Sequence, residues 1–344
     1  MSDVTRQRPS TLAGLTGALR LDGYIIRLIV IVITLFVVFS LIRPESFPTG
    51  RNLRSMAFQA SEIGILAIAV SLTMLTGGID LSINSTANLT GIIAGLILTD
   101  LMPAEGGAPF LVLMLAYGAA LLLGLICGLF NGALIAYVGI PPILATLGTL
   151  TLYQGIATAI TKGATVFGVS QSQFVGNGNL LGIPMPLIML VMIAFVMGVV
   201  LTRTRYGFEV YMLGTNAKAA RFSGINNTAV ILRTYALSGL LSAIAGIVIL
   251  GRTNSANVDF GASYVLLAIL IAVLGGIDPY GGSGRLVGVL LAVIALQFLS
   301  TGLNMALFEI SGANFFKEFA WGAVLVLVLV LNYLDKRRQS RRRV

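Results

Sequence analysis

Two carboxylates in this sequence close the same short glycine motif. Asp80 lies in LTGGIDLSINST at 75–86, and Asp278 lies in LGGIDPYGGSG at 274–284. The two motifs are 198 residues apart, which is too long for a solenoid repeat and fits two related halves of one domain. Such a carboxylate can accept N–H groups at the start of the following helix, or it can contact a ligand or an ion. Both roles stay open, and capping is the favoured one.

The glycine pairs Gly77-Gly78 and Gly275-Gly276 sit between apolar runs. Within hydrocarbon a helix can break only where the freed backbone groups face protein or a water-filled cavity. The motifs therefore predict two helix breaks at a cavity or interface, with Asp80 and Asp278 directly after them. Further capping is expected from the polar residues that follow, which are Ser82, Asn84, Ser85 and Ser283.

Most other polar side chains in the apolar segments are neutral donors and acceptors. They are Asn88, Asn131, Thr146, Thr149, Thr151, Gln154, Gln297 and Asn304, with Glu62 as the charged exception. This set suits a path for a neutral, hydroxyl-bearing solute, and it suits ordinary hydrogen bonding between helices equally well. A proton relay would usually need more buried carboxylates or histidines.

Several kinds of chemistry are disfavoured by what the sequence lacks. There is no histidine, and Cys127 is the one cysteine, so neither a cysteine-based metal cluster nor an intrachain disulfide is expected. No acid pair or nucleophile with a partner base can be identified, which argues against an intramembrane enzyme. We expect no bound metal and no cofactor on this chain.

The composition defines the class of protein. Apolar residues make up 57% of the 344 residues and charged residues 10%, which leaves no polar coat for a water-soluble globule. We predict an all-α, polytopic transmembrane bundle, because many runs are long enough to cross roughly 30 Å of hydrocarbon. Ten spans are predicted, with eight or nine as alternatives, at 24–42, 57–76, 83–99, 110–137, 143–160, 187–202, 228–250, 263–277, 286–307 and 315–334.

The charges predict the orientation. The net charge is +9, yet the basic residues gather at helix ends rather than on a nucleic-acid-binding face, so no nucleic acid is expected. The positive-inside rule places three segments in the cytoplasm: the amino-terminal segment 1–23, the loop 203–227 and the basic tail 335–344. The first and the last of these flank a membrane domain at 24–334, and the loop lies within it. Arg43, Arg51 and Arg54 would then lie outside, against the rule. The first 20 residues lack the features of a cleaved signal peptide.

Two polar loops have contrasting compositions. In 203–227, Thr215-Asn216 can cap a short helix over Ala217–Arg221, and Gly224 can stop it. This helix fits a groove on a cytoplasmic partner, or it is a solvated connector. The loop 161–186 is rich in Gly, Ser, Asn and Gln and should lie outside, where it covers a pathway, receives a soluble protein or simply connects.

Four segments together resemble the ribose-type permease family of bacterial ABC importers. They are LTGGIDLSINSTANLTG at 75–91, NGALIAYVGIPPILATLGTLTLYQGIA at 131–157, GTNAKAARFSGI at 214–225 and LGGIDPYGGSGRLVGVLLA at 274–292. The similarity runs in order over roughly 55–334 and is specific for the family, but not for the sugar.

The resemblance implies an inner-membrane permease without its own ATPase. Cytoplasmic ATP-binding subunits would hold ATP and Mg, a periplasmic binding protein would deliver a monosaccharide or similar solute, and a second, identical or related permease would complete the pathway. No phosphate-loop motif is present in the chain. The family's ATPase-coupling region matches Asn216, Ala217, Ala220, Arg221, Ser223, Gly224 and Ile225, and pathway residues are expected at Asp80, Asn84, Asn131 and Thr146.

Two transport alternatives remain at this point. A secondary transporter driven by protons or sodium would have the same hydropathy, and its transport would follow the ion gradient. A branched-chain amino acid permease would share the architecture, but its zwitterionic substrate would lead us to expect more charged pathway residues.

Overall fold

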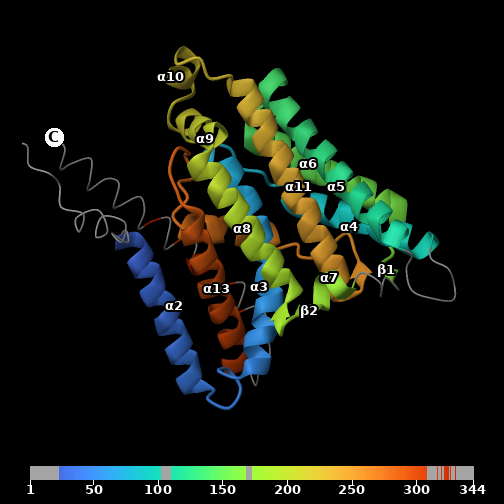
Figure 1. Ribbon diagram of the computed structural model, residues 1–344, viewed down its shortest axis with the longest axis vertical. Helices are drawn as coiled ribbons and strands as arrows, with labels where there is room; N and C mark the ends of the chain where they lie inside the picture. Colours follow the sequence, from blue (N-terminus) through green and yellow to red (C-terminus); the bar gives the residue numbers. More distant parts are fainter. Residues whose placement is uncertain are drawn as a thin grey trace, which may run out of the picture.

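The computed structural model describes residues 23–101, 110–167 and 173–307, together with positions 316, 319, 321–324, 326 and 330. The predicted segment 1–23, apart from its last residue, lies outside the described residues, as do the tail 335–344 and most of the span at 315–334. Within the described part the chain is an all-α bundle of long apolar helices (Figure 1). This confirms an all-α, polytopic membrane protein.

The helix bounds follow the predicted spans closely. The long helices are α2 (Gly23–Ile42), α3 (Gly50–Leu75), α4 (Ile83–Asp100), α5 (Phe110–Ala133), α6 (Pro142–Thr161), α8 (Met185–Arg203), α11 (Asn227–Thr253) and α13 (Leu286–Ala306). Shorter helices are α7 (Gln173–Asn177), α9 (Arg205–Thr215), α10 (Ala217–Phe222) and α12 (Tyr264–Leu274), and a π-helical turn over Leu134–Val138 extends α5.

Seven described helices are long and apolar enough to cross a membrane, namely α2, α3, α5 with its π-helical extension, α6, α8, α11 and α13. Two further predicted spans coincide with α4, whose first half is polar, and with α12, which has only 11 residues. The described positions between 316 and 330 are helical.

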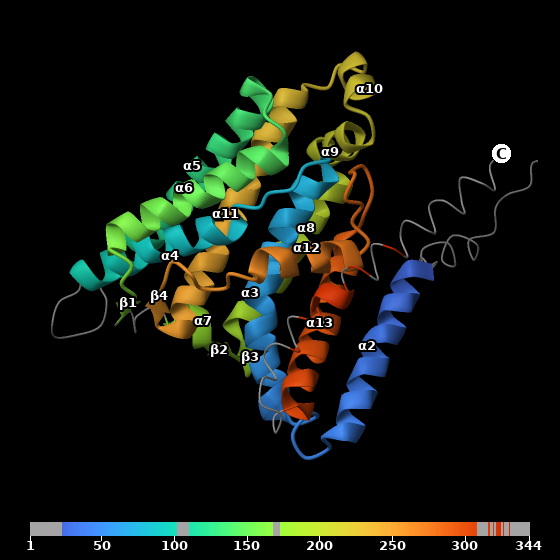
Figure 2. The ribbon, with the colours of Figure 1, turned by 180° about the vertical axis from the view of Figure 1, so that it is seen from behind.

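Two helices form the centre of the bundle. In the most apolar 18-residue stretch of α3 and of α11, 83% is buried, compared with 11% in that of α2. Figure 2 shows α4, α5 and α6 on one side of these two helices and α13 and α2 on the other. Because α3 is covered on all sides from Ala60 onward, this part carries mainly apolar and small residues around its whole circumference rather than along one stripe.

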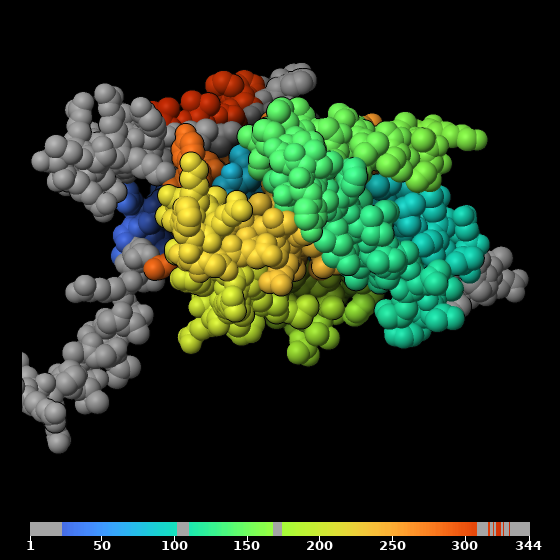
Figure 3. All heavy atoms as spheres, turned by 90° about the horizontal axis from the view of Figure 1, so that it is seen from above, coloured from blue at the N-terminus to red at the C-terminus, as the bar shows by residue number. Residues whose placement is uncertain are grey.

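The two ends of the bundle carry different structures. At one end lie α9 and α10, and Figure 3, which looks onto this end, shows α10 in yellow on the surface. At the opposite end, β1 (Val166–Phe167) pairs antiparallel with β4 (Ser255–Ala256), and β2 (Asn179–Leu180) with β3 (Ile183–Pro184). The turn between α2 and α3 lies at this second end too (Figure 1).

Glycines let α11 approach its neighbours closely. A Cβ atom at Gly128 of α5 would lie 2.2 Å from the carbonyl oxygen of Tyr235, and one at Gly246 would lie 2.2 Å from that of Ala87 in α4. In a membrane, where packing rather than water exclusion holds helices together, such small-residue contacts stabilise the bundle. The close contact between α11 and α4 therefore fixes the position of the first half of α4.

We predict that Gly128→Ala lowers the thermal stability of the detergent-solubilised protein, whereas Gly118→Ala does not. The first change places a methyl group into the backbone of α11 and should cost about 1–3 kcal/mol. At Gly118, on the same helix, a methyl group would meet no neighbouring segment within 4 Å, so alanine there should be neutral or stabilising by up to about 1 kcal/mol. Equal melting temperatures for the two variants would contradict the close packing of α5 on α11.

Candidate functional site

Both Gly-Gly-Ile-Asp motifs end a helix in the same way. After α3, Gly77 has a φ of +84°, and the N–H of Gly78 donates to the carbonyl of Thr73 at 3.1 Å. After α12, Gly276 has a φ of +86°, and the N–H of Ile277 donates to Ala272 at 3.0 Å. Each pattern is a Schellman cap, which needs one residue in the left-handed conformation, and glycine adopts this conformation without strain. The structure thus ends a helix at each of the two glycine pairs.

The two breaks also meet in space. The N–H of Gly282, in the loop after α12, donates to the carbonyl of Leu75, the last residue of α3, at 3.0 Å. Thus a carbonyl freed by the first break is satisfied by the second. We call the contact among the α3 end, the loop 275–285 and α9 the break junction.

Helix α9 completes the break junction. A Cβ atom at Gly214 would lie 2.0 Å from the oxygen of Leu75 and 2.4 Å from the nitrogen of Gly282, so only glycine permits this approach. The hydroxyl of Tyr211 donates to the carbonyl of Gly284 at 3.0 Å. Burial raises the pKa of Tyr211, with the nearby Arg285 acting in the opposite direction, and the neutral phenol remains a donor.

Asp80 is the centre of a buried polar cluster beside the first break. The carboxylate is 2% exposed and accepts from the N–H and the hydroxyl of Ser82, at 2.9 and 2.7 Å, and from the hydroxyl of Ser238 in α11, at 2.8 Å. Ser82 directly precedes α4, so the carboxylate orders the entry to that helix, but α4 itself has no side-chain cap, and the capping expected of Asp80 is not formed.

Two more predicted pathway residues belong to this cluster. The amide nitrogen of Asn131 in α5 donates to the hydroxyl of Ser82 at 2.8 Å, and the hydroxyl of Thr146 in α6 donates to the carbonyl of Ile79 at 3.0 Å. Both side chains are buried. Asn84 points elsewhere, because its amide donates to the carbonyl of Phe260, ahead of α12, at 2.9 Å. The structure thus brings three of the four residues together around the first break.

Asp278, like Asp80, binds the backbone N–H two residues ahead, but it is only partly buried and a longer loop follows it. Its carboxylate accepts from the N–H of Tyr280 at 3.1 Å, while its own N–H donates to the carbonyl of Ser283 at 3.0 Å. The next helix, α13, starts only at Leu286 and has no side-chain cap. The expectation that Asp278 or Ser283 caps that helix is wrong, because the intervening loop folds on itself before the helix begins.

The predicted short helix in the loop 203–227 is confirmed as α10. The side chain of Asn216 accepts from the N–H groups of Lys218 and Ala219, each at 3.0 Å, and Gly224 ends the helix with a φ of +81°. The residues expected to couple to an ATPase fall into two groups. Those on the surface are Asn216, Ala217, Arg221, Ser223 and Gly224, whereas Ala220 and Ile225 are buried against this chain itself.

Phe222, at the end of α10, was not among the residues predicted from the sequence. Its side chain is 92% exposed, although it is the largest apolar group of the helix. A lone aromatic in the otherwise polar and small stretch AKAARFSG was the available signal. An exposed aromatic on a short helix at the end of the molecule has the chemistry of an interface anchor.

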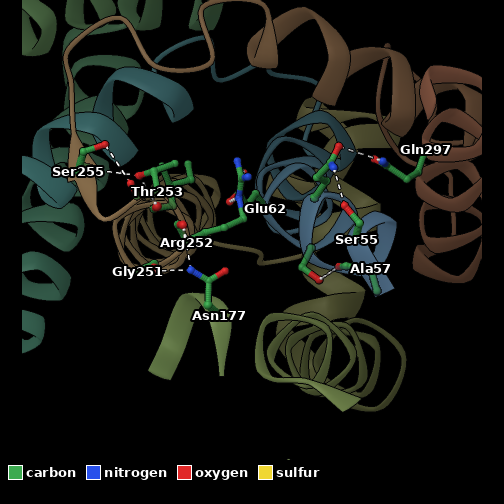
Figure 4. A network of polar contacts seen from close by, with 12 residues as sticks. Ser55, Ala57, Glu62, Asn177, Gly251, Arg252, Thr253, Ser255 and Gln297 are labelled. Carbon is green, nitrogen blue, oxygen red and sulfur yellow. Dashed lines mark hydrogen bonds and ion pairs between the residues drawn. The ribbon is translucent and has the colours of Figure 1, made fainter. Parts of the chain in front are cut away.

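At the opposite end of the bundle, a charged pair joins the two central helices. Figure 4 shows Arg252, in the last turn of α11, beside Glu62 of α3, and both carboxylate oxygens of Glu62 accept from the guanidinium group. The Glu62 side chain is fully buried, and that of Arg252 is 25% exposed. Such a two-point pair fixes the distance and orientation of the helices it joins.

The described part of the loop 161–186 packs onto this same end of α11. The amide of Asn177 in α7 donates to the carbonyls of Gly251 and Arg252, at 3.3 and 3.0 Å, and thereby caps the helix (Figure 4). The guanidinium of Arg54 donates to Asn179 at 3.1 Å, which places this basic residue at the end opposite to α10.

These features define a polytopic helical membrane protein with two broken helices and an exposed short helix linked to both. The chain belongs to the family described as branched-chain amino acid transport system / permease component, whose profile matches residues 52–331. No solved structure matches the chain.

Curated relatives agree with this assignment. The chain is 34% identical to the autoinducer 2 import system permease protein LsrD of Enterobacter sp. (strain 638), over 91% of this chain and 93% of the relative. It is 36% identical to the protein of the same name from Klebsiella pneumoniae subsp. pneumoniae, over 85% and 87%. The resemblance to ABC-importer permeases is thereby confirmed, and the chain is a multi-pass permease subunit of the inner membrane.

We predict that Glu62→Gln lowers the melting temperature in detergent, because it leaves the charge of Arg252 without its counter-ion. Breaking a buried pair costs about 3–5 kcal/mol, and the partial exposure of Arg252 puts the expected loss at or below the lower figure. The double variant Glu62→Gln/Arg252→Gln should recover part of the loss. Glu45→Gln, at an exposed carboxylate, is the control. A melting temperature for Glu62→Gln equal to that of the control would show that the pair contributes no stability.

Proposed function

We propose that this chain is the membrane permease of an ATP-driven importer for a neutral, polyhydroxylated small solute such as a monosaccharide. Autoinducer 2, named in the import systems of the relatives, is the first candidate. The observation that carries the proposal is the break junction, which joins the exposed α10 end to both broken helices through α9.

The buried charges favour a neutral solute over an amino acid. A zwitterion needs a cationic and an anionic receptor in its pathway. Among the described residues, the buried carboxylate of Glu62 is paired with Arg252, and that of Asp80 is held by serine hydroxyls. The remaining buried polar side chains of α4, α5 and α6 are neutral. Neutral amides and hydroxyls exchange hydrogen bonds with a sugar-like solute without trapping it in a deep charge well.

The proposed assembly follows from the family and the charge distribution. The α10 end and both termini face the cytoplasm, with ten spans in total, and the domain at 24–334 lies between the segments 1–23 and 335–344. Two cytoplasmic subunits bind ATP and Mg, a periplasmic protein delivers the solute at the α7 end, and a second permease completes the pathway. Lipid covers the apolar outer faces, where side chains such as Leu111 and Phe195 are exposed.

In the proposed mechanism, α9 transmits movement from the ATPase to the pathway. Asn216 is both the C-cap of α9 and the N-cap of α10, so the two helices move as one unit. ATP binding by the partner subunits displaces α10. Because Gly214 of α9 lies against Leu75 and Gly282, the displacement reaches both breaks and shifts the equilibrium between two pathway states.

The surface of α10 supplies the test. In a complex reconstituted with its ATPase and binding protein, Phe222→Ala and Arg221→Glu should reduce solute-stimulated ATP hydrolysis at least fivefold, because they remove an exposed anchor and reverse a charge. Phe208→Ala is the control, since Phe208 is an exposed phenylalanine of α9, outside the proposed contact. Ala220→Glu is less informative, because the buried Ala220 holds α10 on this chain.

Two results would contradict the proposal. Hydrolysis that is stimulated equally in the wild type and in both α10 variants would show that α10 is a connector. Uptake that persists without the ATPase and collapses with an ion gradient would show a secondary transporter instead.

A further inference from the structure

A small polar cavity opens between α4, α6 and the chain that leads into α12. Its volume is about 110 Å³. Its polar lining consists of Asn84, Ser85, Asn88, Gln154 and Asp259. Asn84 was predicted as a pathway residue, and Asn88 and Gln154 belong to the neutral polar set noted in the sequence, whereas the segment at 257–263 carried no functional expectation. We call this space the α4–α6 cavity.

The asparagines of α4 shape one wall of the cavity. The amide of Asn88 donates to the carbonyls of Val258 and Phe260, at 2.7 and 2.9 Å, and that of Asn84 donates to Phe260 at 2.9 Å. These bonds hold the segment before α12 against α4. The Oδ1 atom of Asn84 is buried and accepts no hydrogen bond from the described part of the chain. A buried acceptor without a donor is costly, so this atom is suited to receive a donor from a ligand or water.

The opposite wall carries a carboxylate that is reachable from outside the chain. The amide of Gln154 in α6 donates to Oδ1 of Asp259 at 3.1 Å, and Asp259 is exposed. No salt bridge to Asp259 is formed by the described residues. A carboxylate held by an amide, with its second oxygen unoccupied by a cation, is a good acceptor for adjacent hydroxyl groups.

We propose that the α4–α6 cavity is a solute subsite of the import pathway that binds neighbouring hydroxyl groups of an uncharged solute. This inference rests on the proposed function. Asp259 and Gln154 bind the hydroxyls, and the free acceptor of Asn84 takes a further donor. Leu150, Val258 and Val265 face the carbon skeleton. The charge of Asp259 disfavours anionic solutes, such as phosphorylated sugars, and it orients hydroxyl donors toward the pocket.

The position of the cavity connects it to the proposed mechanism. Asn84 lies in the first turn of α4, directly after the first break and the Asp80 cluster. Val265 lies in the first turn of α12, the helix that ends in the second break, and Ala262 lies just before that helix. Because the cavity is bounded by α4, which begins after the first break, and by the chain that enters α12, which ends in the second break, a shift at the break junction changes the width of the subsite and thus its affinity for solute.

Cysteine protection tests the subsite directly. In a Cys127→Ala background, which removes the one native cysteine, Gln154→Cys and Asp259→Cys are labelled in the assembled complex with a membrane-impermeant methanethiosulfonate. D-Ribose and autoinducer 2 are the probes, each added at saturating concentration. The transported probe should slow labelling at both positions at least fivefold. Ser255→Cys is the matched control, because Ser255 lies on β4 of the same segment but does not line the cavity, and its labelling should change less than twofold.

Transport kinetics give a second readout, which separates this inference from the proposed function. Asp259→Asn and Gln154→Leu should raise KM for the transported probe about tenfold while ATP hydrolysis stays coupled, and Asp259→Asn should also raise uptake of ribose 5-phosphate relative to ribose. Ser255→Ala should leave KM within twofold of the wild type. If the unaltered complex imports a probe but labelling is not slowed and KM is unchanged, the subsite is overturned and the importer stands. If the unaltered complex shows no ATP-driven uptake of either probe, the proposed function is overturned and the subsite with it.

Discussion

A helix that stops within a membrane leaves backbone groups that only protein can satisfy, and this constraint organises the whole molecule. Two helices, α3 and α12, stop in this way, each through a glycine in the left-handed conformation. Their ends then satisfy one another, since the N–H of Gly282 donates to the freed carbonyl of Leu75. A glycine of α9, Gly214, is required at the same point because no side chain fits between the two backbones. The break junction thus holds segments from three distant parts of the sequence in one place.

The polar interior is arranged around this junction. Asp80 is buried beside the first break and is held by hydroxyl groups rather than by a cation, so it orders the entry to α4. At the end of the bundle opposite to α10, other contacts hold the helices. The ion pair of Glu62 and Arg252 fixes α11 against α3, and the cap from Asn177 fixes it against α7. One end of the bundle therefore combines glycines and backbone contacts, and the other combines a charged pair with a folded loop. This contrast fits a permease in which one end receives movement from an ATPase and the other end faces the delivered solute.

Much of the fold could be predicted from the sequence, because its causes are local. Apolar runs gave the helix bounds to within a few residues for most spans, the glycine pairs predicted the breaks, and Asn216 predicted the start of α10. What remained hidden depends on contacts between distant segments. The sequence cannot show that the two breaks touch, that Ala220 faces inward while Phe222 faces outward, or that Asn84 meets the chain ahead of α12. The capping predicted for Asp80 and Asp278 is not formed, because each carboxylate binds the N–H two residues ahead, which lies before the next helix begins.

Helix α9 links the proposed ATPase contact to both helix breaks through Gly214. The most direct test is the number of solute molecules imported per ATP hydrolysed by a reconstituted complex that carries Gly214→Ala. The added methyl group cannot fit against Leu75 and Gly282, so α9 must move away from the break junction. We expect a variant that still assembles and hydrolyses ATP, but imports several-fold fewer solute molecules per ATP than the wild type. An assembled Gly214→Ala complex with the wild-type ratio would contradict the claim that this contact transmits the movement.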